Sequence, residues 1–393
     1  MYKLKIKYYQ NIRYSYYYSF FSFFGITGLW VIYLQDAGLT LLEVGLCESV
    51  FHIASFLFEI PSGLLADRFS YKTVLIAGRF MAILSVIIML IAHSFLLFAF
   101  SFILSAFSYN LQSGTIDALM YDSLIEENKT QDFPEIISKS EIIFEFADTI
   151  GVTVAGFFVH WHFELTYVIA ILVGVLAMIS IIFIKEPLQV SKNQEIQDHQ
   201  TIIELIKSSW SVLKREKSLR SLMIYQGIID LICTSYYYYY QSVMKDSNFS
   251  GASISILMVV SSVIAIIAIS WIPKITAHFK QFIILRWLKG PFLVVALLLI
   301  FRNTVLLLLL FMIFRAVSAA SGPLFSNYYN ELIESKQRAT LLSVASVIFS
   351  AFMIVLFPLI GWLIDRTSFS ITFGMIGVIL ISFGIVKKIV KSY

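Results

Sequence analysis

The chain has few charged residues for its length. They make up 14% of 393 residues, whereas hydrophobic residues make up 59% and the mean hydropathy is +0.82. A soluble domain of this size could not bury so many apolar side chains, so the composition excludes an ordinary soluble protein and predicts that the bilayer solvates most of the chain. One helical span needs about 20 apolar residues, which leaves room for roughly twelve spans joined by short loops.

Signals for catalysis and cofactor binding are also missing. The two cysteines, Cys47 and Cys233, lie within apolar runs and provide neither a disulfide framework nor a zinc-type Cys/His set. The sequence has no phosphate-binding glycine loop followed by Lys-Ser or Lys-Thr, and no nucleophile elbow. We therefore expect no cofactor, no metal, no nucleic-acid partner and no enzymatic activity. The basic N-terminus is not followed by a small-residue cleavage site, which predicts a retained first helix.

The hydrophobic runs predict an all-α membrane protein with twelve transmembrane helices in two six-helix bundles. The predicted spans are 16–35, 41–63, 73–93, 95–121, 139–160, 164–184, 219–241, 252–272, 282–301, 304–329, 338–363 and 369–386. A long polar stretch separates the sixth span from the seventh. The expected domains are an N-terminal bundle at 1–185, a cytoplasmic linker at 186–218 and a C-terminal bundle at 219–393.

The basic residues favour a topology with both termini in the cytoplasm. In this orientation nearly all lysines and arginines, Arg79 among them, lie in the linker or at or near the cytoplasmic ends of spans. The exceptions are Lys245, Arg302 and Arg366 on the opposite side and Arg315 within a span. An odd number of spans or an inverted chain would remove this excess of basic residues on the cytoplasmic side.

An internal repeat relates the two halves. Ser113-Gly114, followed by YDSLIE at 121–126, matches Ser321-Gly322, followed by YNELIE at 329–334, at a constant offset of 208 residues. Repeats in the same orientation imply two parallel bundles related by an axis along the membrane normal, with the substrate site between them.

The loop between the second and third spans carries the sequence GLLADRFSYK at 63–72. Together with the spans, the linker and the repeat, it resembles the signature G-x-L-A-D-R-x-G-R-K of the major facilitator superfamily, and the resemblance covers essentially the whole chain. It departs from the signature at Ser70 and Tyr71. The resemblance implies a secondary transporter similar to the bacterial drug-efflux members of the family.

In that family the aspartate of the loop stabilises the outward-open state by contacting span 11. The resemblance therefore implies that Asp67 contacts Arg338 and the helix that begins there. Gly63, Arg68 and Lys72 complete the group expected to gate the conformational change.

Two ionisable residues lie near mid-depth in the second half, Asp230 in span 7 and Arg315 in span 10. An ionisable group at that depth is costly and suggests function. We expect Asp230 and Arg315 to face each other in the central cavity, where they bind substrate or couple its movement to protonation of Asp230. The alternative is a permanent ion pair that orders the C-terminal half.

Span 2 carries Glu48, His52 and Glu59 on one helical face, since they are spaced by four and seven residues. A histidine between carboxylates suggests a proton path. The alternative is a set of hydrogen-bonded packing residues.

Further polar residues lie in spans 4 and 5. Asp148 is deep in span 5, whereas Glu141 is expected near the cytoplasmic boundary and solvated. Asn110 and Gln112 in span 4 are candidate substrate contacts. Asp117 and Asp122 either close a cytoplasmic gate or cap helix ends.

Five consecutive tyrosines, Tyr236 to Tyr240, end span 7. An aromatic belt at the membrane interface explains most of them, and one or two are expected to face the cavity mouth, where they could stack on an apolar or cationic substrate.

These patterns predict a monomeric transporter in the plasma membrane of a bacterium. We expect it to move a small molecule by alternating access, with proton-coupled export of a lipophilic or cationic compound as the leading hypothesis. Uptake or movement of a lipid-like molecule is the first alternative. A polytopic lipid-modifying enzyme is a distant one, because the loops are short and the polar residues are scattered.

Overall fold

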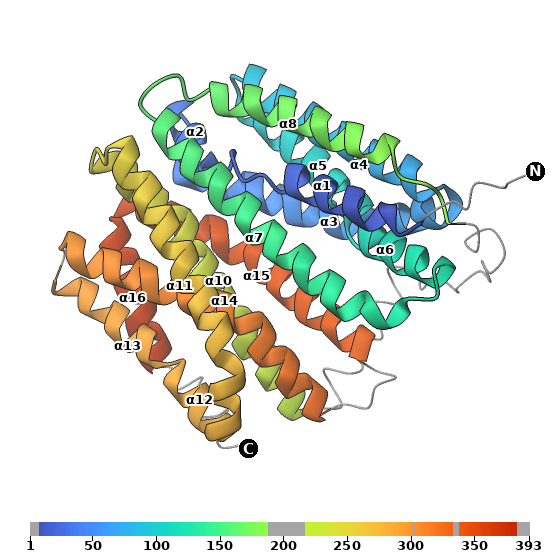
Figure 1. Ribbon diagram of the computed structural model, residues 1–393. Helices are drawn as coiled ribbons and strands as arrows, with labels where there is room; N and C mark the ends of the chain where they lie inside the picture. Colours follow the sequence, from blue (N-terminus) through green and yellow to red (C-terminus); the bar gives the residue numbers. More distant parts are fainter. Residues whose placement is uncertain (1–7, 188–216, 302, 333–337, 383–393) are drawn as a thin grey trace, which may run out of the picture. The chain divides into compact units, whose positions relative to one another are not determined.

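The computed structural model describes the chain except for residues 1–7, 188–216, 302, 333–337 and 383–393. Within the described ranges all regular structure is helical, as the sequence predicts (Figure 1). The helices are α1 (Gln10–Ser22), α2 (Trp30–Asp36), α3 (Leu41–Arg68), α4 (Tyr71–Ile91), α5 (Phe95–Gln112), α6 (Thr115–Glu126), α7 (Phe133–Phe158), α8 (Leu165–Ile182), α10 (Lys217–Asp246), α11 (Gly251–His278), α12 (Gln281–Trp287), α13 (Gly290–Val295), α14 (Thr304–Leu332), α15 (Arg338–Arg366) and α16 (Phe369–Ser382), with the 3-10 helices η1 (Thr130–Asp132) and η3 (Ala296–Leu299).

Several helices are solvated by lipid. Among the described residues, seven helical stretches are long and apolar enough to cross a membrane: Leu41–Ala66, Tyr71–Ile91, Phe95–Glu126, Leu165–Ile182, Gly251–His278, Thr304–Ser326 and Val344–Arg366. Large apolar side chains remain exposed on them, such as Leu57, Leu172 and Ile266. Acyl chains solvate such a surface, so the protein is a multi-pass membrane protein.

Three of the predicted spans are not continuous helices. The range 16–35 divides into α1 and α2, the range 95–121 into α5 and α6, and the range 282–301 into α12, α13 and η3. The second break contains Gly114 at φ +74°, a left-handed conformation that residues with a side chain disfavour. The third contains Pro291, which lacks the N–H that a continuous helix requires. Hydropathy alone cannot locate such breaks inside an apolar run.

The chain forms two compact units. Unit 1 comprises Met1–Trp30, Val50–His199 and Ser250–Ser255, and unit 2 comprises Val31–Ser49, Gln200–Phe249 and Ile256–Tyr393. The bundle boundaries expected at 1–185 and 219–393 stay a prediction, and most of the expected linker lies outside the described residues.

In unit 1, α4 packs against α5 and α8, while α1 packs against α7 and α8. A buried cluster that includes Tyr18, Leu75, Leu119 and Ile181 joins α1, α4, α6 and α8. The approach of α4 to α5 is close at Gly78, where an added β-carbon would lie 2.9 Å from Cγ of Gln112. A larger residue there would have to displace the side chain of Gln112, so glycine allows the close approach of the two helices.

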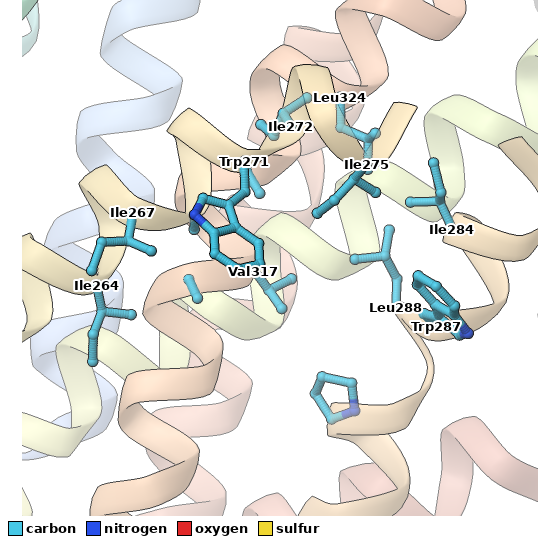
Figure 2. A pocket seen from close by; sticks show the side chains of 14 residues that line it. Ile264, Ile267, Trp271, Ile272, Ile275, Ile284, Trp287, Leu288, Val317 and Leu324 are labelled. Carbon is cyan, nitrogen blue, oxygen red and sulfur yellow. The ribbon is translucent and has the colours of Figure 1, made fainter. Parts of the chain in front are cut away.

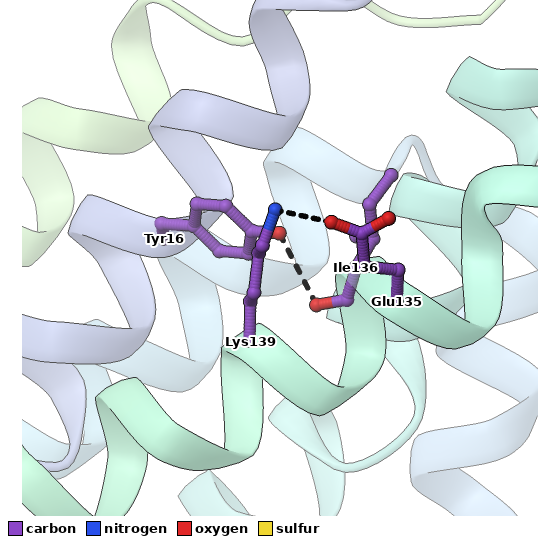
Figure 3. Close-up of polar contacts among 4 residues, drawn as sticks. All are labelled: Tyr16, Glu135, Ile136 and Lys139. Carbon is purple, nitrogen blue, oxygen red and sulfur yellow. Dashed lines mark hydrogen bonds and ion pairs between the residues drawn. The ribbon is translucent and has the colours of Figure 1, made fainter.

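The start of α7 makes a hydrogen bond to α1 and contains an ion pair of its own. Tyr16 donates a hydrogen bond to the carbonyl of Ile136 at 3.2 Å, and Lys139 pairs with Glu135 at 2.6 Å (Figure 3). The hydrogen bond from Lys139 lowers the pKa of Glu135. Because both side chains of the ion pair are largely exposed, the pair contributes little to stability.

In unit 2, α10 packs against α14 and α15. Tyr236, Tyr239 and Tyr240 of α10 are completely buried in this contact. Tyr236 donates to the carbonyl of Leu307 at 3.0 Å, and Tyr239 donates to that of Phe357 at 2.9 Å. The interface-belt interpretation is therefore wrong for these three tyrosines, which are core residues. The buried hydroxyl of Tyr240 has no hydrogen-bond partner among the described residues.

Residues 31–49 join unit 2 through polar contacts. The carboxylate of Asp365 accepts hydrogen bonds from the backbone N–H groups of Leu41 at 3.2 Å and Leu42 at 2.9 Å, at the N-terminus of α3. Asp36 pairs with Lys245 at 2.8 Å. A carboxylate at a helix N-terminus is favourable because the unpaired N–H groups there carry partial positive charge.

Candidate functional site

A polar cavity of about 470 Å³ lies in unit 1 and is the candidate functional site. Five helices, α1, α4, α5, α6 and α7, supply its wall. The residues that line it are Ser19, Ser22, Phe23, Arg79, Ala82, Ser105, Ser108, Tyr109, Gln112, Ser113, Gly114, Ile116, Asp117, Ser140, Glu141 and Phe144. Its size is that of a site for a small organic molecule.

The break between α5 and α6 shapes one wall of this cavity. Gly114 turns the chain in its left-handed conformation, and Ser113, Gly114, Ile116 and Asp117 all line the space. The hydroxyl of Thr115 donates to the carbonyl of Leu111 at 2.8 Å and so satisfies one acceptor that the break leaves open. The N-terminus of α6, which has no side-chain cap, therefore borders the cavity.

Arg79 supplies positive charge to the same cavity from α4. Its Nη1 donates to the carbonyl of Ser22 at 3.1 Å, while its Nε is buried without a hydrogen-bond partner. Tyr18 lies beside it and hydrogen-bonds Gln112. The sequence places Arg79 at or near the cytoplasmic end of a span, which stays a prediction; the structure adds that Arg79 lies eight positions into α4 and lines a cavity.

Asp117 and Glu141 supply negative charge from α6 and α7. Both side chains are exposed at the cavity wall, and no ion pair to either is found in the part of the chain that the structure describes. The sequence predicted solvent around Glu141 and a gating or capping role for Asp117. Their shared cavity was missed, since it depends on how α6 packs against α7.

Asp230 and Arg315 lie on α10 and α14 of unit 2. Asp230 has Gln226 and Ser321 as its close polar neighbours, and Tyr329 donates to Oε1 of Gln226 at 2.6 Å. The guanidinium of Arg315 lies 5.5 Å from the ring centre of Tyr237. A direct role of Asp230 and Arg315 in binding or coupling stays a prediction.

The other candidate residues of the first half lie on α3, α5 and α7. Glu48 and His52 are on α3, one turn apart. Asn110 joins α5 to α3, because its Oδ1 accepts a hydrogen bond from Ser55 at 2.8 Å. Asp148 packs so closely on the non-helical segment after α1 that a β-carbon at Gly25 would collide with its carboxylate. Neither Asn110 nor Asp148 lines the polar cavity.

The loop that carries the family signature is partly described. Lys72 ties α4 to the end of α8, since its Nζ donates to the carbonyl of Ile182 at 2.8 Å. Arg68 is exposed, and an added β-carbon at Gly63 would meet no atom within 4 Å in the described part of the chain. The side chains of Asp67 and Arg338 lie outside the described residues.

A second cavity, in unit 2, has an apolar wall. It measures about 440 Å³ and is lined by side chains of α11, α12, α13 and α14 and the residues between them, including Ile264, Trp271, Trp287 and Leu324 (Figure 2). Trp271 and Trp287 are more than half exposed, at 58% and 53%. A groove of this composition is solvated by acyl chains without any further ligand.

The two cavities occupy corresponding places in the repeat. Five of their wall positions correspond at the offset of 208 residues: Arg79 with Trp287, Ser108 with Ala316, Tyr109 with Val317, Gln112 with Ala320, and Ile116 with Leu324. The polar members all belong to unit 1.

Known proteins resemble the chain over most of its length. The sequence is 23% identical over 347 residues to the uncharacterized MFS-type transporter YxaM of Bacillus subtilis (strain 168), covering 83% of this chain and 84% of that protein. It is 23% identical over 311 residues to the quinolone resistance protein NorA of Staphylococcus aureus (strain MSSA476), covering 78% and 77%. The crystal structure of the nucleoside transporter NupG superposes with a TM-score of 0.76 at 17% identity, covering 98% of this chain and 99% of that one, which shows a shared fold.

The profile of one family matches residues 15–346, which is most of the chain and includes large parts of both units, the loop signature and the wall of the polar cavity. The protein therefore belongs to the Major Facilitator Superfamily of transporters.

Proposed function

We propose that the protein is a monomeric secondary transporter with twelve spans, arranged as six-helix bundles at 1–185 and 219–393 around a cytoplasmic linker at 186–218. Both termini lie in the cytoplasm, and the membrane is the cytoplasmic membrane of a bacterium. The family assignment and the distribution of basic residues support this arrangement. Transport proceeds by alternating access of a small molecule to the two sides.

We further propose proton-coupled export of a lipophilic or cationic compound. The observation that carries this proposal is the pair of accessible carboxylates, Asp117 and Glu141, on the wall of a cavity within apolar helices. A carboxylate holds either a cation or a proton. A cationic substrate therefore leaves when the carboxylates are protonated on the outer side, and the protons leave on the inner side before the next substrate binds.

The carboxylates of this cavity lie apart from those that the sequence singled out. In this proposal, six residues outside the cavity wall assist binding or coupling: Asp230, Arg315, Glu48, His52, Asp148 and Asn110. The conformational change is gated by Asp67, Gly63, Arg68, Lys72 and Arg338. The resemblance to the quinolone resistance protein NorA supports export over uptake.

The test uses everted membrane vesicles from cells that express the chain, with ethidium as a lipophilic cation. Export in cells appears as uptake into everted vesicles. We expect ethidium uptake when respiration acidifies the vesicle lumen, and its loss when an ionophore collapses the proton gradient. Asp117→Asn and Glu141→Gln together should reduce uptake to the level of vesicles without the protein. Glu164→Gln is the matched control, because Glu164 is an exposed carboxylate just before α8 and does not line the cavity. Uptake that ignores the gradient, or that the double substitution leaves intact, contradicts the proposal.

A further inference from the structure

We infer that the unit 1 cavity binds molecules that carry an anionic group as well as a basic one, with Arg79 and the N-terminus of α6 holding the anionic group. This inference deepens the proposed function and rests on it for the role of Asp117 and Glu141. It assigns the substrate class as amphoteric organic molecules, such as an aromatic carboxylate with a protonated amine.

The guanidinium of Arg79 has a hydrogen-bond donor that finds no acceptor among the described residues. A guanidinium has five N–H donors, and burial without partners is costly. The bond from Nη1 to the carbonyl of Ser22 uses one donor, while Nε is buried without a partner. No acidic side chain pairs with Arg79 in the described ranges. Because Arg79 lines the cavity and no acidic side chain among the described residues offsets its charge, a carboxylate in the cavity suits its guanidinium as a charged hydrogen-bond acceptor.

The N-terminus of α6 adds a second source of positive potential. α6 is 12 residues long, its N-cap is Gly114, and no side chain caps its first turn. The N–H groups of a first turn have no partner within the helix and favour an anion. Ser113, Gly114 and Ile116 share the cavity wall with Arg79, so both groups act on the same space.

The position of Arg79 is held from three sides. α4 approaches Gln112 of α5 closely at Gly78, and Tyr18 of α1 hydrogen-bonds that same glutamine. On the side of α8, a β-carbon at Gly174 would lie 3.9 Å from Nε of Arg79. These neighbours limit the positions that the Arg79 side chain can take, so an anion that enters the cavity meets a pre-positioned positive charge.

The opposite charges on the wall set the substrate class. Asp117 and Glu141 come from α6 and α7, whereas Arg79 comes from α4, and the ion pairs found among the described residues do not join them. The wall of the cavity therefore presents both signs of charge, with Asp117 in the first turn of α6 and Arg79 on α4. A molecule with an acid and an amine satisfies both, whereas a simple cation leaves Arg79 without an acceptor.

The experiment measures binding to the purified full-length protein in nanodiscs by isothermal titration. The probes are 2-naphthoate, the uncharged 2-naphthylmethanol and the amphoteric 6-(aminomethyl)-2-naphthoate. We expect the amphoteric probe to bind best and the alcohol least. Arg79→Gln should weaken binding of 2-naphthoate roughly 10- to 100-fold, because a charged hydrogen-bonded partner is lost. The affinity of Arg79→Lys for 2-naphthoate should lie between those of the wild type and Arg79→Gln, because lysine keeps the charge but lacks the planar donor geometry of arginine.

Arg286→Gln is the matched control, since it removes the same charge from the exposed position beside Trp287 in unit 2 and should leave all three affinities unchanged. Asp117→Asn with Glu141→Gln should remove only the advantage of the amphoteric probe. Equal binding of 2-naphthoate by a folded Arg79→Gln protein, or equal binding of acid and alcohol by the wild type, overturns the inference. Loss of gradient-driven ethidium uptake bears on the proposed function alone, because binding of 2-naphthoate requires no transport.

Discussion

The two cavities share a position in the repeat but differ in chemistry. In unit 1 the wall carries Arg79, Gln112 and Asp117, and 208 residues later the same positions hold Trp287, Ala320 and Phe325. The first cavity therefore offers charges and hydrogen bonds, whereas the second offers only apolar contacts. Duplicated helices can thus keep their packing while one copy retains polar chemistry and the other adapts to lipid.

The backbone differs between the same two regions. Ser113-Gly114 interrupts the helix, and Gly114 has a φ of +74°. Ser321-Gly322 lies within the continuous helix α14, and Pro323 follows it. Thr115 can donate its hydroxyl to the last turn of α5, but the corresponding Pro323 has no such group. The polar copy is the broken one, which places a helix N-terminus beside its cavity.

Exchanging the residues at positions 117 and 325 should give the largest effects. Phe325 is fully buried, so Phe325→Asp loses about 3–5 kcal/mol of packing and also buries an unpaired carboxylate. That loss is comparable to the whole stability of a typical domain, and we expect no folded protein by size-exclusion chromatography. Asp117→Phe, at an exposed position on the cavity wall, should fold but lose ethidium transport.

The two substitutions test the role of each position independently. If Phe325→Asp accumulates as a folded transporter, position 325 is not the apolar counterpart that the burial indicates. If Asp117→Phe transports at the wild-type rate, the polar cavity has no part in transport.

The two repeat-related glycines should respond differently to alanine. A β-carbon meets no atom within 4 Å at either Gly114 or Gly322, so the substitutions differ only in backbone conformation. Gly114→Ala forces a left-handed alanine and should destabilise unit 1 by roughly 1–2 kcal/mol. Gly322→Ala should be neutral or stabilise α14 by about 0.5–1 kcal/mol, because alanine favours a helix. Unfolding in increasing SDS measures both, and equal changes would show that Gly114 does not require its left-handed conformation.

Much of the fold could be predicted from the sequence, because hydropathy and charge act over whole helices. The apolar runs locate the helices, and the basic residues indicate their orientation. The breaks could not be located in the same way. Ser113-Gly114 and Ser321-Gly322 match each other, but different residues follow them, Thr115 and Pro323, and hydropathy does not indicate which of the two pairs breaks its helix.

The candidate site was less accessible to sequence reasoning. Depth along a helix singled out Asp230 and Arg315 as candidates, whereas Arg79 was one of many basic residues expected at or near the cytoplasmic ends of spans. Arg79, Asp117 and Glu141 become one site only when α4, α6 and α7 are brought together. The repeat did contain a signal for this site: at the offset of 208 residues, Arg79 and Asp117 correspond to the apolar residues Trp287 and Phe325.

The smallest expected effect concerns the exposed ion pair of α7, which has no counterpart in unit 2, where Ser343 and Val347 occupy the corresponding positions. Lys139→Ala should leave the unfolding transition unchanged, because solvent screens both groups. Since Lys139 lowers the pKa of Glu135, any contribution is present near neutral pH and disappears as the pH falls through that lowered pKa. Tyr16→Phe is the matched comparison and should cost about 1 kcal/mol through the lost bond to Ile136. If Lys139→Ala destabilises the protein more than Tyr16→Phe near neutral pH, then charge at the start of α7 contributes to the stability of unit 1.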